Sequence, residues 1–96
     1  MLTGTQKRFL RGLGHGLKPV VLVGKNECNA ALTEETGSAL AAHELIKIKL
    51  LESCPMDRHE VAEKLAVAAD AEVAQILGRT ILLYRQGETP KIELPK

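Results

Sequence analysis

The chain has 96 residues, of which 45% are hydrophobic and 26% are charged, and its formal net charge is +1. This length suits one domain that buries about 60–65% of its unfolded surface. We therefore expect residues 1–96 to form a single domain, with a polar tail over residues 87–96. No apolar run approaches the ~18 residues of a membrane helix, and the amino terminus lacks the apolar core of a signal peptide. Cys28 and Cys54 have no zinc or redox spacing, which favours free thiols and a cytoplasmic protein.

Charge is distributed unevenly along the chain. Residues 1–25 carry five lysines and arginines and no carboxylate, whereas residues 26–46 carry four glutamates and no lysine or arginine. Such asymmetry favours an oriented electrostatic surface over a uniformly solvated one. Phe9 and Tyr84 are the two aromatic residues of the types Phe, Trp and Tyr. This scarcity argues against proteins that stack several bases on an aromatic sheet.

A first helix is predicted from Thr3 or Thr5, either of which can cap it, to about His15. Its end is expected near Gly12 and Gly14, which weaken a helix. Apolar residues at three- and four-residue steps predict its buried side, namely Phe9, Leu10, Leu13 and Leu17. Basic or titratable side chains fall on the opposite side, namely Lys7, Arg8, Arg11 and His15. An ordinary solvated face is the alternative, but the absence of any carboxylate favours a binding surface.

Residues 15–26, HGLKPVVLVGKN, are the most informative stretch of the sequence. Pro19 begins a wholly apolar run, which ends at Gly24 and is followed by Lys25 and Asn26. A continuous apolar run is typical of a strand buried on both faces, so we expect a central or near-central strand. Glycine lets backbone N–H groups approach a ligand, and the next helix adds partial positive charge at its amino end. The pattern predicts an anion-binding corner in which phosphate is the favoured anion.

Asn29 is a good N-cap for a second helix that ends near Ala42. We expect its buried side to consist of Leu32, Thr36, Ala39, Leu40 and His43. Residues 45–50 then alternate between apolar and basic, which predicts a strand buried on one face. Lys47 and Lys49 are expected to point outward, and the core-facing residues are Ile46, Ile48 and Leu50.

A third helix is predicted after a loop over residues 52–56, because Asp57 and Glu60 have the spacing of a capping box. It extends to about Ala69, and its apolar side is expected to contain Val61, Leu65 and Ala68. Two strands, over residues 72–77 and 80–85, are joined by the two-residue turn Gly78-Arg79, in which glycine comes first. In the tail, Ile92 and Leu94 are available to dock on the domain.

The predicted order of elements is therefore α-β-α-β-α-β-β. Two strand–helix–strand crossovers imply parallel pairing, and the final hairpin adds an antiparallel pair. We predict an α/β fold in which three helices cover one four-stranded mixed sheet.

In this order and spacing, several short segments resemble the bacterial YhbY-like proteins, which are single copies of the CRM (chloroplast RNA splicing and ribosome maturation) domain. The resemblance covers about residues 5–96 and is carried by Lys7 and by residues 10–13, 17–21, 24–26, 43–49, 78–80, 83–85 and 95. It implies a fold similar to the C-terminal domain of bacterial translation initiation factor three, and an RNA-binding role. Bacterial members of this family associate with precursors of the large ribosomal subunit, and plant members act in intron splicing.

One position departs from the family pattern. The family's loop is usually Gly-x-x-Gly, similar in role to the loop by which KH domains clamp backbone nucleotides. Here Gly24 is the first glycine, but the fourth position is Glu27. A carboxylate places negative charge where phosphate should bind, and a residue other than glycine pays about 1–2 kcal/mol for a left-handed conformation. Gly24, Lys25 and Asn26 remain candidates for backbone contact, whereas the role of Glu27 stays open.

The predicted RNA-binding residues are Lys7, Arg8, Arg11, Lys18, Gly24, Lys25, Asn26, Lys47, Lys49 and Arg79. Structural alternatives exist for several of them: Lys25 as a solvated loop residue, Arg79 as part of a hairpin turn, and the strand lysines as an exposed sheet face. Tyr84 is interpreted as a packing residue.

Catalysis has little support in the sequence. His43 and Glu44 are adjacent, but no nucleophile or second carboxylate is paired with them. The three histidines make no metal motif. We therefore expect a protein that is not an enzyme, with RNA, in particular ribosomal RNA, as its partner and with no cofactor, metal, membrane or small-molecule substrate. A small enzyme for a phosphorylated substrate and a protein–protein adaptor on the ribosome are the alternatives.

Overall fold

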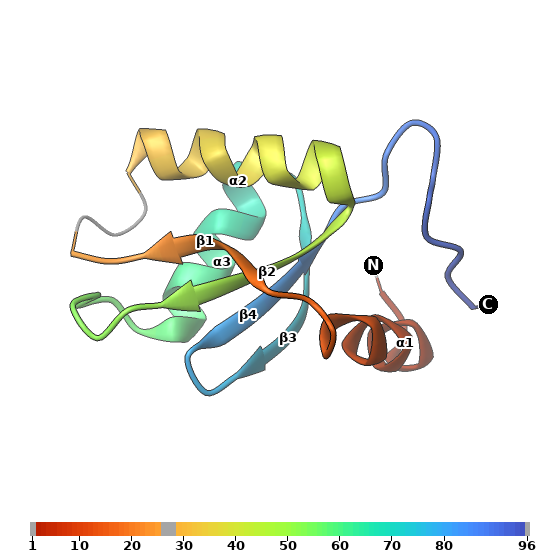
Figure 1. The fold of residues 1–96 in the computed structure, drawn as a ribbon, viewed down its shortest axis with the longest axis horizontal. Helices are drawn as coiled ribbons and strands as arrows, with labels where there is room; N and C mark the ends of the chain where they lie inside the picture. Colours follow the sequence, from red (N-terminus) through yellow and green to blue (C-terminus); the bar gives the residue numbers. More distant parts are fainter. Residues whose placement is uncertain (1, 26–28, 96) are drawn as a thin grey trace.

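The computed structural model describes residues 2–25 and 29–95. Its element order confirms the predicted α/β class (Figure 1). The elements are α1 (Gly4–Gly14), β1 (Pro19–Val23), α2 (Ala30–His43), β2 (Leu45–Leu50), α3 (Arg58–Ala68), β3 (Glu72–Leu77) and β4 (Thr80–Tyr84). In Figure 1, α3 lies behind the sheet, α2 runs along the upper edge of the view, and α1 lies at one end of the sheet.

The four strands form one mixed sheet in the order β1-β2-β4-β3. β1 pairs with β2 in parallel, whereas β4 pairs antiparallel with both β2 and β3. The crossover through α3 therefore joins two strands that run in the same direction without pairing, because β4 lies between them. The parallel pairing expected for this crossover is therefore wrong. The hairpin of β3 and β4 joins the sheet on the side of β2 away from β1, which leaves β1 at the edge, so the expected central position of that strand is wrong too.

The burial of β1 also differs from the expectation of a strand covered on both faces. Val21 and Val23 are fully buried, but Val20 is 46% exposed and Leu22 is 52% exposed. The physical reason is that α2 contacts β1 on one face, whereas α1 contacts β2 and β3 on the other. We call the face of the sheet opposite α2 and α3 the open face; α1 covers it only in part.

The main core fills the space between the sheet and the two helices α2 and α3. The predicted inward side chains Ile46, Ile48 and Leu50 lie in it, together with Leu40 and Leu65. Two predicted members do not: His43 and Ala68 are exposed. His43 ends its helix, and the chain turns inward only at the next residue. On α3 the buried stripe is centred differently from the prediction, since it contains Val61, Ala62, Leu65, Ala66 and then Ala69.

A second, smaller core holds α1 against the open face. The helix begins with a capping box, in which Thr3 accepts from the Gln6 N–H and the Gln6 side chain accepts from the Thr3 N–H. It docks through Leu10, which is fully buried. Its partners in this cluster are Leu2, Leu45, Ala74, Leu82 and Tyr84. Phe9 is 40% exposed and Leu13 is 43% exposed, so the predicted buried side of this helix is wrong for both residues.

Gly14, the last residue of the helix, explains why α1 buries Leu10 and leaves Phe9 and Leu13 exposed. A Cβ atom at this position would lie 2.5 Å from Leu82 Cδ1 and 2.9 Å from Leu82 Cδ2. The absence of a side chain lets the end of α1 approach the sheet along the line of Leu10 and Gly14. Gly14 therefore ends the helix as predicted and also sets how the helix packs.

Glu44 connects the sheet to the C-terminal tail. It has a positive φ of 61° and is only 2% exposed, at the turn between α2 and β2. Its carboxylate accepts hydrogen bonds from the backbone N–H groups of Gly87 (2.7 Å), Lys91 (2.8 Å) and Ile92 (2.9 Å). These bonds, the one from Gly87 above all, lower the pKa of Glu44 although burial opposes them. Ile92 and Leu94 pack against the second core, which confirms that the tail docks.

The turn between β3 and β4 has the predicted form. Gly78 has a positive φ of 58°, and Leu77 pairs with Thr80 across the two-residue connection. β4 ends at Tyr84, one residue earlier than predicted. The side chain of Arg85 extends towards the helices. Its guanidinium donates to the carbonyl oxygens of Ala69 (2.7 Å) and Gly37 (3.0 Å), so Arg85 ties α3 to α2.

Candidate nucleic-acid interface

The predicted site residues lie in three places, of which the first is α1. Lys7 and Arg8 are exposed and Arg11 is partly exposed. No carboxylate occurs along the helix, so no ion pair within it neutralises these cations. Negative charge near the amino end would stabilise a helix, so the sequence of α1 forgoes this gain and keeps its cations without an acidic neighbour on the same helix.

The second place is the open face of the sheet. Lys47 and Lys49 point away from α2 and α3, as predicted, because their neighbours Ile46 and Ile48 face the core. Lys47 is half-buried and Lys49 is exposed. Lys18 lies directly before β1 and is exposed, and the register pairs the next residue, Pro19, with Lys47. The fold thus brings Lys18 beside the basic pair of β2.

The third place is the end of the sheet farthest from α1. The N–H of Leu51 donates to Val23 (2.8 Å), and the N–H of Leu50 donates to Arg79 (2.7 Å), so the end of β1 and the 78–79 turn meet there. Lys25 and Arg79 are both exposed. The Arg79 guanidinium lies 3.5 Å from the carbonyl oxygen of Leu51. Asn26 and Glu27 fall outside the described residues.

Gly24 has no conformational need for glycine, since its φ is not in the left-handed region. A Cβ atom there would lie 3.4 Å from Leu51 Cδ1 and 3.4 Å from the Ser53 hydroxyl, at the limit of ordinary contact. If Gly24 has a special role, it is to let a ligand come close to its backbone, because neither its conformation nor its packing requires glycine.

The structure does not gather the five cations of residues 1–25 into one cluster. A strand rises about 3.3 Å per residue, so Lys18 and Gly24 lie on the order of 20 Å apart along β1. Lys47 and Lys49 lie between them on the neighbouring strand. The basic residues are therefore spread along the open face, and we call the set formed by Lys18, Lys25, Lys47 and Lys49 the lysine track.

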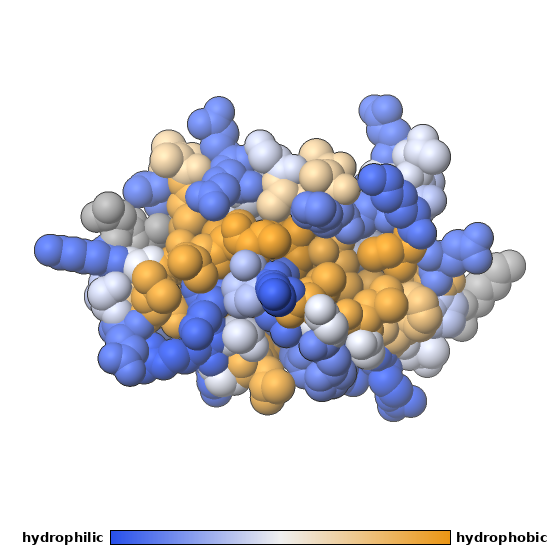
Figure 2. All heavy atoms as spheres, viewed as in Figure 1, coloured by the Kyte–Doolittle hydropathy of each residue, from blue (hydrophilic) through white to orange (hydrophobic). Residues whose placement is uncertain are grey.

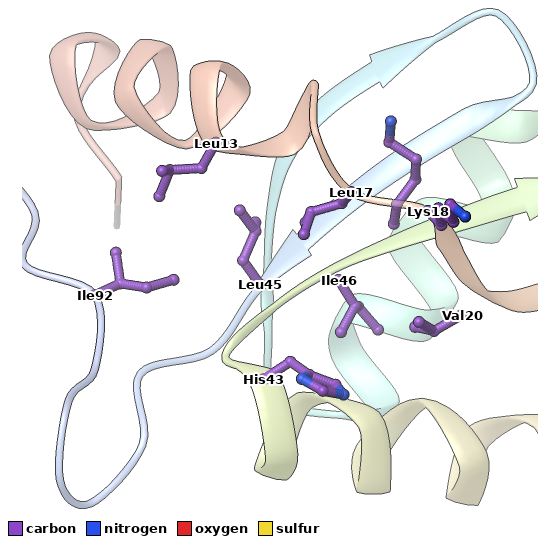
Figure 3. Close-up of a pocket in the computed structure, with 9 residues that line it drawn as sticks. Leu13, Leu17, Lys18, Val20, His43, Leu45, Ile46 and Ile92 are labelled. Carbon is purple, nitrogen blue, oxygen red and sulfur yellow. The ribbon is translucent and has the colours of Figure 1, made fainter.

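A groove that the sequence did not indicate lies beside the start of this track. It has a volume of about 400 Å³ and separates the end of α1 from the end of α2 (Figure 3). Leu13 and Leu17 line one side, His43 lines the other, and Leu45 and Ile46 lie between them. The sequence could not reveal it, because Leu13, Leu17 and Val20 have the spacing of core residues.

Tyr84 packs inside the second core and is 4% exposed, which confirms its interpretation as a packing residue. Within the described part of the chain, its hydroxyl has no hydrogen-bond partner. Burial raises the pKa of Tyr84, and the nearby carboxylates of Glu44 and Glu72 raise it further.

Other kinds of site find little support in residues 2–25 and 29–95. No group of three histidine, cysteine, aspartate or glutamate side chains there could hold a metal ion. No helix among them is long and apolar enough to cross a membrane. Cys54 is a free, half-buried thiol, and Cys28 falls outside the described residues.

Comparison with known proteins gives consistent matches over the whole chain. A relative from Bacillus subtilis (strain 168), named Probable RNA-binding protein YqeI, is 44% identical over 96 residues, covering 99% of this chain and 100% of the relative. A protein from Haemophilus influenzae named RNA-binding protein is 36% identical over 95 residues, covering 99% of this chain and 96% of that protein. The solution structure of the hypothetical protein SAV1595 from Staphylococcus aureus is similar with a TM-score of 0.83 at 40% identity, covering 99% of this chain and 100% of that one.

The family assignment rests on a match that spans most of the chain. The family model of the CRS1 / YhbY (CRM) domain matches residues 2–85, from the residue before the α1 cap to the end of the sheet. All four strands and three helices fall inside this range. The chain therefore belongs to the CRS1 / YhbY (CRM) domain family.

Proposed function

We propose that this protein binds RNA through phosphate-backbone contacts and that its partner is ribosomal RNA in precursors of the large subunit. The relatives named as RNA-binding proteins support the first part of the proposal. The second part, ribosomal RNA of large-subunit precursors as the partner, carries over to this chain what the family resemblance implies. The proposed role is assembly of the ribosome in the cytoplasm, by binding and without catalysis.

The observation that carries the proposal is the placement of basic side chains around the open face. The cations of α1 lie at one end, Lys25 and Arg79 lie at the other, and Lys47 and Lys49 lie between. Phosphate contacts from lysine and arginine supply most sequence-independent affinity for nucleic acids. The cations are spread over about 20 Å along a strand. This spacing fits an RNA backbone with its regularly spaced phosphates better than it fits one small anion.

The residue types also indicate what kind of RNA contact to expect. Within the described residues, the open face carries Tyr84 as its aromatic side chain, and that ring is buried in the second core. The aromatic sheet platform by which some RNA-binding domains stack several bases is therefore missing here. Contacts to phosphate and ribose remain as the principal mode of binding, and they depend on RNA shape more than on sequence.

Purification of ribosomal precursors with and without nuclease treatment tests the partner class. An RNA-binding protein loses its association with the particles when exposed RNA is digested, whereas an adaptor that contacts ribosomal protein keeps it. The adaptor reading would be correct if the protein stayed bound after digestion.

Replacing the α1 cations tests the interface. The variant with Lys7, Arg8 and Arg11 all changed to Gln should bind a ribosomal RNA hairpin more weakly, and similarly across RNA sequences, with little change in melting temperature. For the single change Lys7→Gln, Lys64→Gln is a matched control, because Lys64 is exposed on α3, behind the sheet. Lys64→Gln should leave binding unchanged. Equal effects of the two changes would show that α1 is only a solvated helix face.

A further inference from the structure

The groove between α1 and α2 has the composition of a ligand site. Its volume of about 400 Å³ falls in the range typical of small-molecule sites. Its walls are formed by aliphatic side chains. Two of these lining residues, Leu13 and Val20, are 43% and 46% exposed. Figure 2 shows apolar side chains gathered on this face, along β1 and between α1 and α2. Contiguous exposed apolar surface of this kind marks binding sites.

The polar groups at the groove define the charge of its ligand. Lys18 and Lys47 line it, with the imidazole of His43 opposite, and no carboxylate is among the lining residues. Glu44 follows His43 in sequence, but its carboxylate is bound by three backbone N–H groups of the tail. The groove therefore combines apolar walls with a cationic rim.

We propose that this groove binds one unpaired nucleobase of the RNA, while the phosphates on either side of that nucleotide contact Lys18 and Lys47. This inference rests on the proposed RNA-binding function and adds a base site to it. A nucleotide has the complementary chemistry, since its base has flat apolar faces and its phosphate carries the negative charge. The groove also continues directly into the lysine track, because Lys18 and Lys47 belong to both.

Aliphatic walls are sufficient for such a site. Bases removed from a stack are held between aromatic or apolar side chains and are read by hydrogen bonds at their edges. His43 supplies a polar edge here, because the two ring nitrogens of an imidazole form hydrogen bonds. Paired bases of an A-form helix are hidden in a deep, narrow major groove. The site therefore requires a bulge, loop or strand end, and the proposal predicts a preference for RNA with an unpaired nucleotide.

The test uses three fluorescent RNA hairpins with the same stem. One has a single bulged uridine, the second has an abasic ribose at that position, and the third is fully paired. The first two carry the same number of phosphates, so their difference reports the base alone. Wild-type protein should bind the bulged hairpin about tenfold more tightly than the abasic one, near the lower end of the effect of stacking a base on an aromatic ring, because the walls here are aliphatic.

Two valine-to-serine variants give a matched comparison. Val20 lines the groove, whereas Val67 is exposed on α3, behind the sheet (Figure 1). Val20→Ser should reduce the bulged-to-abasic ratio to less than about threefold, and Val67→Ser should leave it near about tenfold. Leu13→Ser is a second groove variant, on a different element, and melting curves check that each protein is folded.

The outcomes separate this inference from the proposed function. Binding of all three hairpins without preference for the bulge, or a preference that both groove variants retain, overturns the base site and leaves phosphate binding intact. Failure of the wild-type protein to bind any hairpin overturns both proposals. If groove variants bind RNA normally but lose a partner that survives nuclease treatment, the groove belongs to a protein ligand and the base site is wrong.

Discussion

The packing of α1 on the sheet predicts that alanine substitutions at Gly12 and Gly14, two residues apart, change the stability of the protein in opposite directions. A Cβ atom at Gly12 would meet nothing within 4 Å, whereas at Gly14 it would lie 2.5 Å from Leu82 Cδ1. Replacing glycine by alanine in a helix usually stabilises a protein by about 0.5–1 kcal/mol. Gly12→Ala should show this gain.

Gly14→Ala should instead destabilise the protein. Leu82 is 3% exposed and is enclosed in the second core, so it has little room to move away from the new methyl group. Overpacking of a core costs about 1–3 kcal/mol, which exceeds the gain in helix propensity. The two variants should therefore differ by about 1–3 kcal/mol in free energy of unfolding.

Thermal melting followed by circular dichroism measures this difference. For a domain of this size, 1 kcal/mol corresponds to about 4–8 °C in melting temperature, so Gly14→Ala should melt at least about 4 °C below Gly12→Ala. If both variants were stabilised alike, the close approach of α1 to Leu82 would be wrong. The position of the α1 cations relative to the sheet would then be wrong too.

Three further predictions concern the core and the tail. The pKa of Glu44 is lowered, so the ionised carboxylate stabilises the fold above the ordinary pKa of 4.5, and this stabilisation is lost as the pH falls through the folded-state pKa. The melting temperature should therefore fall over this acidic range in the wild type and less steeply in Glu44→Gln. Equal slopes would contradict the role of the Glu44 hydrogen bonds. Tyr84→Phe removes a buried hydroxyl that has no partner among the described residues, so urea unfolding should show unchanged stability or a gain of up to about 1 kcal/mol; a clear loss would reveal a hydrogen bond to that hydroxyl. Val21→Asp buries a charge at a fully buried position and should cost several kcal/mol, whereas Leu22→Asp, at a position that is 52% exposed, should be tolerated; similar melting temperatures for the two variants would refute the orientation of β1.

Local sequence patterns predicted most of the secondary structure. The alternation in residues 45–50, the cap Asn29 and the glycine-first turn at Gly78 all act within a few residues, and the structure confirms each. Asp57 also caps its helix, but it accepts from the His59 N–H in place of the expected capping box with Glu60. The class of fold followed from the order of these elements. What the patterns could not predict depends on contacts between distant segments.

The errors at β1 and α1 share one physical origin. The apolar run 20–23 has the composition of a central strand, but the hairpin of β3 and β4 joins the sheet on the far side of β2 and leaves β1 at the edge. Likewise Phe9 and Leu13 have core spacing, yet the contact of Gly14 with Leu82 turns them towards solvent. The exposed apolar surface that results forms one side of the groove, so the wrongly predicted residues Leu13 and Val20 are those that line the proposed base site.

The site residues were not equally predictable from the sequence. Lys47 and Lys49 lie on the outer face as predicted, because strand alternation is a local property. Lys25 is close to the cations of α1 in sequence and was expected to share a surface with them, but the length of β1 separates them in the fold. The three tail N–H groups bound by Glu44 lie more than forty residues away in sequence and had no local signal.

The salt dependence of RNA affinity tests the central claim, that the open face of the sheet contacts phosphate. Each phosphate contact steepens the dependence of log affinity on log salt by about 0.7–0.9. Lys49, on the open face, and Lys64, on α3, are both exposed lysines. We predict that Lys49→Gln lowers the slope for a ribosomal RNA hairpin by nearly one such contact and that Lys64→Gln leaves it unchanged. An unchanged slope for Lys49→Gln, or an equal fall for both variants, would contradict binding of RNA at the open face.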